Sequence, residues 1–247
     1  RPPRSTLFPY TTLFRSGQQV VSPILTIIDD ATLSYFNGEV MRGFYEYDDE
    51  GVKSRPVTLV EKGVLKNFLM SSSPIKNFPA SNGHGRGNHY FRPVARMAVT
   101  RALAEQTVTY DELEKKFLQE IKRQNKPYGF MIEDLSGGFT MTATYNPQAF
   151  KLEPTLMYRV YPDGRKEVVR GLDMVGTPQV SFNKVLAAAD DYQVFNGSCG
   201  AESGWVPVSA IAPSVLLESM EMEKKQKSTE KPPLLPPPYS LHKGVSK

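Results

Sequence analysis

Residues 56–70, PVTLVEKGVLKNFLM, carry the local pattern that decides the fold class. Two runs rich in apolar and β-branched residues, Pro56–Glu61 and Val64–Met70, flank the dipeptide Lys62-Gly63. A two-residue connection that contains glycine is typical of a tight β-hairpin, because glycine readily adopts the positive φ that such turns require. The stretch therefore predicts two adjacent antiparallel strands.

Strand-like runs continue on both sides of this hairpin. Val20–Ile28 is rich in Val and Ile and ends at Asp29-Asp30. Farther along, Thr155–Tyr161 and Lys166–Val169 flank the turn sequence Pro162-Asp163-Gly164, which predicts a second hairpin. Repeated hairpins with short turns favour an antiparallel sheet.

Two segments have helical patterns instead. Thr109 and Glu112 form a capping box, and apolar residues then recur on one face until Lys126-Pro127 ends the helix. A second helix is expected from about Pro178 to Ala189, a segment with a run of Ala. Together the patterns predict an α+β domain over about residues 17–223, mainly antiparallel β-sheet with hairpins and a few helices.

Composition narrows the class of partner. No stretch approaches the ~18 consecutive apolar residues of a membrane span, so no membrane association is expected. The formal net charge is +4, but Arg1, Arg4 and Arg15 and the Lys-rich residues 222–247 carry the excess and leave the middle at about −3. Nucleic-acid binders concentrate Lys and Arg on a folded face, so nucleic acid is not an expected partner.

The two ends of the chain differ in composition from residues 17–223. Residues 1–16, RPPRSTLFPYTTLFRS, repeat Thr-Leu-Phe without a regular period and are typical of a translated sequencing adapter, the alternative being a natural Pro-rich arm. Residues 224–247 are rich in Pro and Lys and predict a disordered tail. Its PPLLPPPY run is either solvated or docks on an aromatic groove of a partner domain.

A glycine-rich segment is the first candidate site. Asn82-Gly83-His84-Gly85-Arg86 continues into a further glycine and His89, which predicts a loop. The spacing of phosphate-binding loops is absent from it. Two histidines five residues apart could ligate a metal, and the alternatives are a structural loop or one that lines a substrate site.

Two acidic clusters and a single cysteine are the other candidates for catalytic or metal-binding residues. Asp29-Asp30 and Asp48-Asp49-Glu50-Gly51 could supply oxygen ligands or an acid and a base, but their setting at strand ends favours turns. Cys199 is the only cysteine, which excludes an intramolecular disulfide. It could be a small buried hydrophobe, a metal ligand, or a nucleophile that uses His84 or His89 as its base.

Several short motifs, taken in order over about residues 17–222, resemble the C-terminal domain of the TldD/PmbA metallopeptidase family. They are Ser22-Pro23 with Thr26–Asp30, Tyr47–Gly51, Thr58–Lys66, Asn82–Arg86, Pro93–Met97, Gly197–Gly200 and Val206-Pro207-Val208.

This resemblance implies a zinc metallopeptidase that cleaves peptides or unfolded segments by metal-activated water. Its zinc is held by two histidines of an HExxxH helix and by a cysteine that Cys199 matches. We therefore expect Cys199 to be a metal ligand. The HExxxH motif, with its catalytic glutamate, is not in this sequence and in the family precedes the position aligned with residue 17. We expect the chain to be an N-terminally truncated fragment that is inactive alone.

The resemblance also implies a substrate groove and a partner. Asn82, Gly83, His84, Gly85 and Arg86 align with a family loop that would border the groove, where exposed backbone could pair with an extended peptide. A related family subunit would be the partner, in a homo- or heterodimer, and the location would be cytoplasmic. The alternatives are a non-catalytic PmbA/TldE-like subunit and a gyrase-regulating protein, which the slightly acidic core disfavours.

Overall fold

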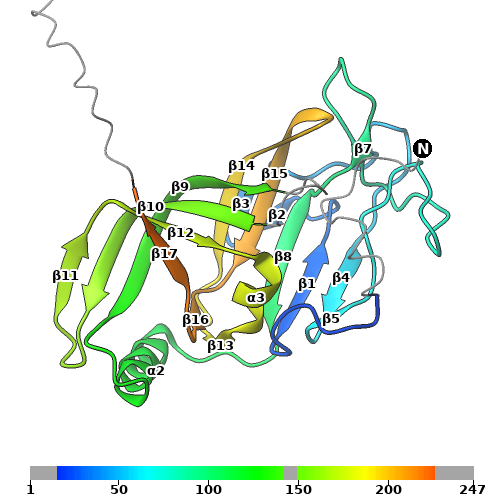
Figure 1. The fold of residues 1–247 in the computed structure, drawn as a ribbon. Coiled ribbons are helices and arrows are strands. Elements are labelled where there is room, and N and C mark those ends of the chain that lie inside the picture. The colour runs from blue at the N-terminus through cyan, green and yellow to red at the C-terminus, as the bar shows by residue number, and fades with distance from the viewer. Residues whose placement is uncertain (1–15, 142–148, 226–247) are drawn as a thin grey trace, which may run out of the picture.

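The computed structural model describes residues 16–141 and 149–225 (Figure 1). Its largest element is a six-stranded sheet in the order β14-β15-β8-β1-β4-β5. Neighbouring strands are antiparallel except for β15 and β8, which are parallel. The strands are β1 (Leu25–Asp29), β4 (Val57–Glu61), β5 (Val64–Leu65), β8 (Val99–Ala104), β14 (Gln193–Ala201) and β15 (Gly204–Ala212).

A second, five-stranded sheet is built around one long strand. That strand, β10, pairs with β9 along its length, while β11 and β12 pair with different parts of its other edge and β17 pairs with β12. In Figure 1 this sheet lies to the left of the six-stranded sheet. Its strands are β9 (Gly129–Met141), β10 (Ala149–Val160), β11 (Lys166–Val169), β12 (Leu172–Gly176) and β17 (Glu221–Lys224).

Three short strand pairs and two helices complete the described part of the chain. The pairs are β2 (Tyr35–Phe36) with β3 (Glu39–Val40), β6 (Gly85–Arg86) with β7 (Val94–Ala95), and β13 (Val185–Ala188) with β16 (Val215–Leu217); the helices are α2 (Tyr110–Arg123) and α3 (Pro178–Asn183). The predicted α+β class with a mainly antiparallel sheet is confirmed. Neither helix is long and apolar enough to cross a bilayer.

The hairpin at Lys62-Gly63 forms as expected. Lys62 and Gly63 both have positive φ, 47° and 81°, and the ladder pairs Val60 with Leu65. This is the turn geometry whose twist matches that of the flanking strands. The hairpin of β10 and β11 is also confirmed, with Val160 paired with Lys166.

Helix α2 is confirmed together with its cap. The Thr109 side chain accepts from the Glu112 N–H, and the Glu112 carboxylate accepts from the Thr109 N–H. Leu113 and Ile121 are buried, and Asn125 at φ 51° leaves the helical conformation just beyond the last turn. Local capping and an apolar stripe thus suffice to place this helix.

The predicted helix from Pro178 to Ala189 is wrong in its second half. Helix α3 ends at Asn183, and Val185–Ala188 is strand β13, which pairs with β16. Val185 belongs to the largest core cluster, and its carbonyl accepts from the Ser22 hydroxyl at 2.8 Å. Pairing and burial therefore override the helix propensity of the Ala run.

The apolar core is divided among three clusters. The largest gathers apolar residues from within 20–25 and 60–70 with Val185, and a second joins Met41 to Val99 and Ile211 of the six-stranded sheet. The third packs Leu113 of α2 against Ala189 and Leu216. The predictions for residues 1–15 and for the Pro-rich tail from residue 226 onward lie outside the described residues.

Candidate functional site

Cys199 lies near the end of β14, in the hairpin that β14 forms with β15. It is half-buried, has a free thiol, and stands directly opposite Val206 in the ladder. The next residue, Gly200, lies under the indole of Trp205, where a Cβ would come within 3.0 Å of the ring. Glycine at that position thus lets the Trp205 ring lie against the strand next to the cysteine.

Arg96 anchors this hairpin to the interior. Its side chain is only 1% exposed, and Nη1 donates to the Ser203 hydroxyl at 2.8 Å and to the Gly204 carbonyl at 2.9 Å. Nη2 donates to the carbonyl of Cys199 itself. The backbone at Cys199 is therefore held by a buried guanidinium that comes from the residue after β7.

The glycine-rich segment is interior, not an open loop. All five residues from Asn82 to Arg86 are buried, and His84 is 0% exposed. The Asn82 side chain accepts from the Met70 N–H and donates to the Phe68 carbonyl. Backbone exposed for pairing with a peptide is thus not seen in this segment, and its role in substrate binding stays a prediction.

His84 is enclosed by hydrogen-bonding partners. Its Nε2 lies 3.2 Å from Oδ1 of Asp29, and its Nδ1 lies 3.1 Å from Oδ1 of Asn82. Asp29 is also 0% exposed and accepts from the Ala98 N–H and the Thr100 hydroxyl. Both ring nitrogens are engaged, so His84 could bind a metal only by breaking these contacts. Asp29, expected in a turn, instead ends β1 inside the core.

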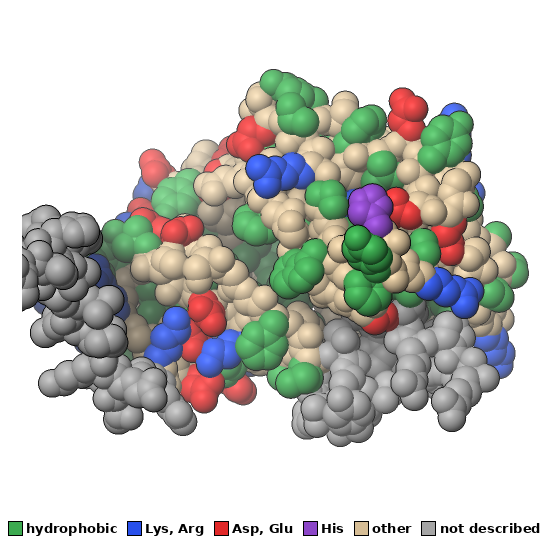
Figure 2. Space-filling view, turned by 90° about the horizontal axis from the view of Figure 1, so that it is seen from above, with side chains coloured by type: hydrophobic (Ala, Val, Ile, Leu, Met, Phe, Trp, Pro, Cys, Tyr) green, Lys and Arg blue, Asp and Glu red, His purple; other side chains and the backbone are tan. Residues whose placement is uncertain are grey.

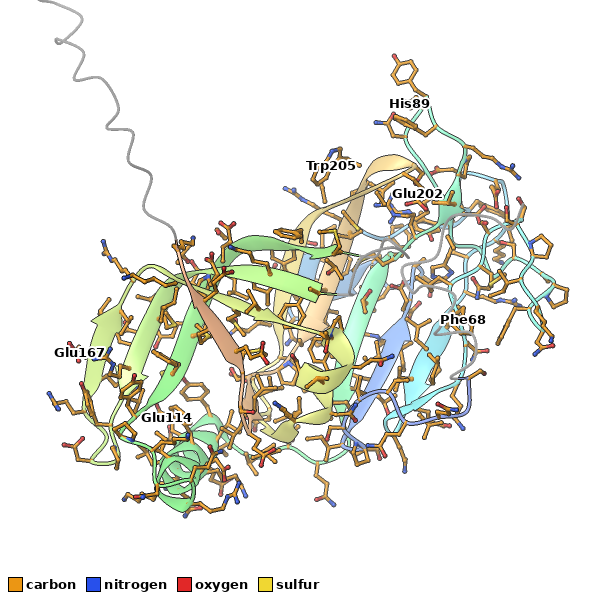
Figure 3. The ribbon with its side chains drawn as sticks, in the orientation of Figure 1. Phe68, His89, Glu114, Glu167, Glu202 and Trp205 are labelled. Carbon is orange, nitrogen blue, oxygen red and sulfur yellow. The ribbon has the colours of Figure 1, made fainter. Side chains whose placement is uncertain are left out.

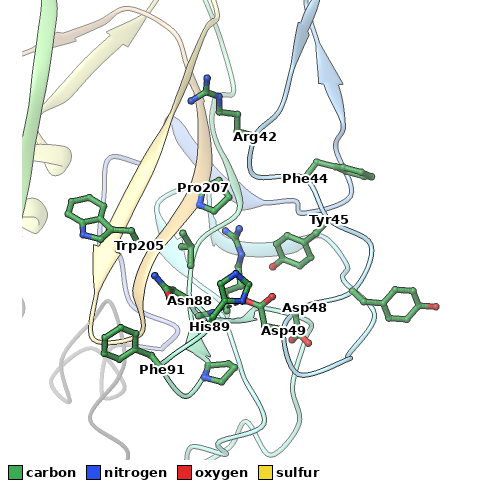
Figure 4. A pocket seen from close by; sticks show the side chains of 15 residues that line it. Arg42, Phe44, Tyr45, Asp48, Asp49, Asn88, His89, Phe91, Trp205 and Pro207 are labelled. Carbon is green, nitrogen blue, oxygen red and sulfur yellow. Dashed lines mark hydrogen bonds between the residues drawn. The ribbon is translucent and has the colours of Figure 1, made fainter.

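A cleft of about 750 Å³ lies between the glycine-rich segment and the Cys199 hairpin. Its walls come from the chain after β3, from the loop between β6 and β7, and from the start of β15 (Figure 4). Arg86 lines the cleft, as does Val206, the ladder partner of Cys199. The structure thus brings two of the predicted site regions to one cavity.

Aromatic rings surround this cleft. Trp205 is 70% exposed, Tyr47 58%, Phe91 52% and Phe44 40%. In Figure 4 Trp205 and Phe91 lie on one side, and Phe44 and Tyr45 lie on the other. Figure 3 places Trp205 and His89 along the same edge of the molecule, and Figure 2 shows hydrophobic side chains gathered around the exposed histidine. Such a lining suits an extended ligand with large side chains.

The polar wall of the cleft is built on Tyr45 and Arg86. The Arg86 guanidinium lies over the Tyr45 ring, 4.7 Å from its centroid, and Nη1 donates to the Met97 carbonyl. The Tyr45 hydroxyl donates to the Gly83 carbonyl at 2.9 Å. Burial raises the pKa of the Tyr45 hydroxyl and lowers the pKa of Arg86. Both groups are thus held in place before any ligand arrives.

The carboxylates of Asp48 and Asp49, beside this wall, accept hydrogen bonds from backbone N–H groups. Asp48 accepts from the N–H groups of Glu50, Val52 and Gly85, and Asp49 accepts from the Gly87 N–H at 2.7 Å. The predicted turn at Asp48–Gly51 is confirmed, since Gly51 has a φ of 77°. These contacts fix the glycine-rich segment against the chain before β4.

The donor set of this chain fits a zinc site only in part. Within residues 16–141 and 149–225, no three His, Cys, Asp or Glu side chains come together in a metal-binding group. Cys199 offers one half-buried sulfur, a donor that suits zinc. A catalytic zinc site with three protein ligands would therefore need two ligands besides Cys199, at least one of them from outside residues 16–141 and 149–225.

Sequence reasoning missed Arg96, Tyr45 and Trp205. Arg96 stands inside the apolar run Val94–Val99, and a charged residue in such a run is a signal that could have been used. Tyr45 and Trp205 gave no comparable signal, because exposed and structural aromatic residues look alike in a sequence.

Comparisons with known proteins point to one family. A model of the PmbA/TldA metallopeptidase C-terminal domain matches residues 7–224. A metalloprotease of Archaeoglobus fulgidus is 30% identical over 203 residues, covering 82% of this chain and 43% of that protein. A metalloprotease TldD homolog of Haemophilus influenzae is 28% identical over 208 residues, covering 83% and 39%. A zinc metalloprotease TldD homolog of Saccharolobus solfataricus is 23% identical over 179 residues, covering 71% and 37%.

Solved structures share the fold. A candidate modulator of a DNA gyrase from Thermotoga maritima superposes with a TM-score of 0.59 at 22% identity, covering 85% of this chain and 41% of that one. TldE from Thermococcus kodakarensis gives 0.58 at 15% identity, covering 84% and 41%. The chain thus spans less than half the length of each of these proteins.

Proposed function

The chain belongs to the PmbA/TldD metallopeptidase family, and on that premise we propose that its full-length protein is a zinc-dependent peptidase to which Cys199 contributes one metal ligand. The observation that carries the proposal is the position of Cys199. Its hairpin borders an aromatic cleft of about 750 Å³, and the family match extends over it.

The residues of this chain would position and enclose the reaction. When bound, zinc supplies a water of lowered pKa that acts as the nucleophile. Arg96 would hold the Cys199 backbone in place through its hydrogen bond to the carbonyl. The rings of Trp205, Phe44 and Tyr47 would cover a peptide segment and exclude water from it.

A non-catalytic subunit is the second candidate. The chain shares its fold with TldE over 84% of its length, and we therefore keep this hypothesis beside the first. In this case the cleft would enclose a substrate that a related subunit cleaves. A related family subunit is a proposed partner under both hypotheses.

Zinc content and peptide cleavage by the full-length protein test the proposal. We expect about one zinc per chain, cleavage of an unfolded peptide, and loss of both in Cys199→Ser. Ser198→Ala, at an exposed neighbouring position, is the matched control and should keep both. Absence of zinc from the wild-type protein and from both variants would contradict the peptidase proposal and favour the non-catalytic subunit.

A further inference from the structure

The Arg86 side chain lines the cleft without a paired anion among residues 16–141 and 149–225. The residue is 6% exposed, and the one hydrogen bond that its side chain makes to a described residue runs from Nη1 to the Met97 carbonyl. None of the ion pairs between described residues involves it. Its Nε and Nη2 are not among the fully buried atoms without a partner, and Arg86 lines the cleft, so an anion in the cleft could reach the guanidinium.

The two acidic side chains that line the cleft, those of Asp48 and Asp49, already accept hydrogen bonds. Asp48 accepts three backbone N–H groups through its two oxygens, and Asp49 accepts the Gly87 N–H through Oδ2. The Tyr45 ring lies against one face of the guanidinium. A ring face does not satisfy N–H groups that point out along the plane, so Nε and Nη2 are left without a described protein acceptor.

The open direction is the cleft. Arg86 lines it, and Arg42, an exposed residue of the same lining, adds a second positive charge. Asn88 lines it too, and its Oδ1 is buried with no donor among the described residues. A peptide carries both groups that these side chains lack: a carboxylate for the Arg86 guanidinium and a backbone N–H for Oδ1 of Asn88.

We propose that this cleft binds the carboxylate of a peptide, with Arg86 as the residue that recognises it. Arginine presents paired N–H groups that match the two oxygens of a carboxylate. The ligand is either a peptide C-terminus or an Asp or Glu side chain, and the aromatic rim covers the adjacent residue. The inference rests on the proposed peptidase function, because it names the substrate class of the same cleft.

Three acetylated peptides distinguish the sources of the carboxylate. The first is Ala-Ala-Phe-Ala-Ala with a free C-terminus, the second is its C-terminal amide, and the third is the amide with Glu as the last residue. Calorimetric titration of the 247-residue chain measures binding of each. We expect the first or the third to bind at least about tenfold more tightly than the second. Tighter binding of the first assigns the C-terminus, and tighter binding of the third assigns a side chain.

Variants assign the preference to Arg86. We expect Arg86→Gln to abolish the preference for the carboxylate and Arg86→Lys to keep part of it, while Arg165→Gln, on the distant β10-β11 hairpin, leaves it unchanged. Equal binding of all three peptides by the wild-type chain overturns the proposal even if Arg86→Gln fails to fold. A preference that persists in a folded Arg86→Gln also overturns it. Neither outcome depends on zinc or on cleavage, so both are separate from failure of the peptidase proposal.

Discussion

The guanidinium of Arg96 donates a hydrogen bond to the carbonyl oxygen of Cys199, which lies 103 residues later in the sequence. The same side chain also holds the turn at Ser203 and Gly204. Because Arg96 is 1% exposed, the backbone of the proposed metal ligand is fixed from inside the protein. A ligand that is held before the metal binds loses less freedom on binding.

Substitution of Arg96 should loosen the Cys199 hairpin. Lysine cannot donate in three directions of one plane, so we expect Arg96→Lys to lower the free energy of unfolding by about 2 kcal/mol. Urea denaturation measures the loss. The reaction rate of Cys199 with a thiol reagent under native conditions should also rise, whereas exposed Arg42→Lys should leave both quantities unchanged. An unchanged Cys199 reactivity in Arg96→Lys would contradict the anchoring role.

Removal of Asp29 should destabilise the domain strongly. Its carboxylate is 0% exposed and accepts from Ala98, Thr100 and the ring of His84. Asp29→Ala leaves these groups buried and unpaired, and we expect a loss of roughly 3–5 kcal/mol in the free energy of unfolding. Exposed Glu39→Ala is the control and should change it by less than about 0.5 kcal/mol. A loss below about 1 kcal/mol in Asp29→Ala would show that the network is dispensable.

Two glycines with the same backbone conformation should respond differently to alanine. Gly83 and Gly51 both have a φ of +77°, but a Cβ on Gly83 would lie 2.5 Å from the Lys53 carbonyl, whereas a Cβ on Gly51 meets nothing within 4 Å. Gly51→Ala adds only backbone strain of about 1 kcal/mol, and Gly83→Ala should cost clearly more. Thermal or urea unfolding of the two variants compares them. Equal losses would mean that the segment has room to move away from Lys53.

The stability of α2 should depend on acid pH through Glu120. Hydrogen bonds from Arg123 and Gln124 lower the pKa of Glu120 from 4.5 to about 2. A carboxylate with a depressed pKa in the folded state stabilises fully above its unfolded pKa, and this contribution falls as the pH drops from about 4.5 towards 2. We expect the unfolding free energies of wild type and Glu120→Gln to differ more at about pH 6 than at about pH 3. A difference between wild type and Glu120→Gln that does not depend on pH would contradict the assignment.

Local sequence signals predicted much of the fold. The Lys62-Gly63 hairpin and the Thr109 capping box formed as expected, because each depends on residues that are close in the chain. The Ala run after α3 was misjudged as helix, because its strand pairing with β16 comes from about 30 residues farther along. Pairing between distant segments leaves no mark on local propensity.

The sequence indicated some residues of the candidate site but not how they contact one another in the fold. Cys199 and the glycine-rich segment were both singled out, yet the burial of His84 depends on Asp29, which lies 55 residues away. The anchoring of Cys199 by Arg96 and the aromatic rim around Trp205 likewise arise only when separate loops meet. No spacing rule connects residues that only the tertiary fold brings together.

Cobalt substitution in the full-length protein tests most directly whether Cys199 binds the metal. Cobalt replaces zinc in many sites, and a thiolate ligand gives it a charge-transfer absorption that oxygen and nitrogen ligands do not give. We predict that the wild-type protein shows this absorption and that Cys199→Ser, purified in folded form, loses it while Ser198→Ala retains it. A cobalt-loaded wild-type protein without the absorption, or a Cys199→Ser protein that keeps it, would contradict the assignment of Cys199 as a metal ligand.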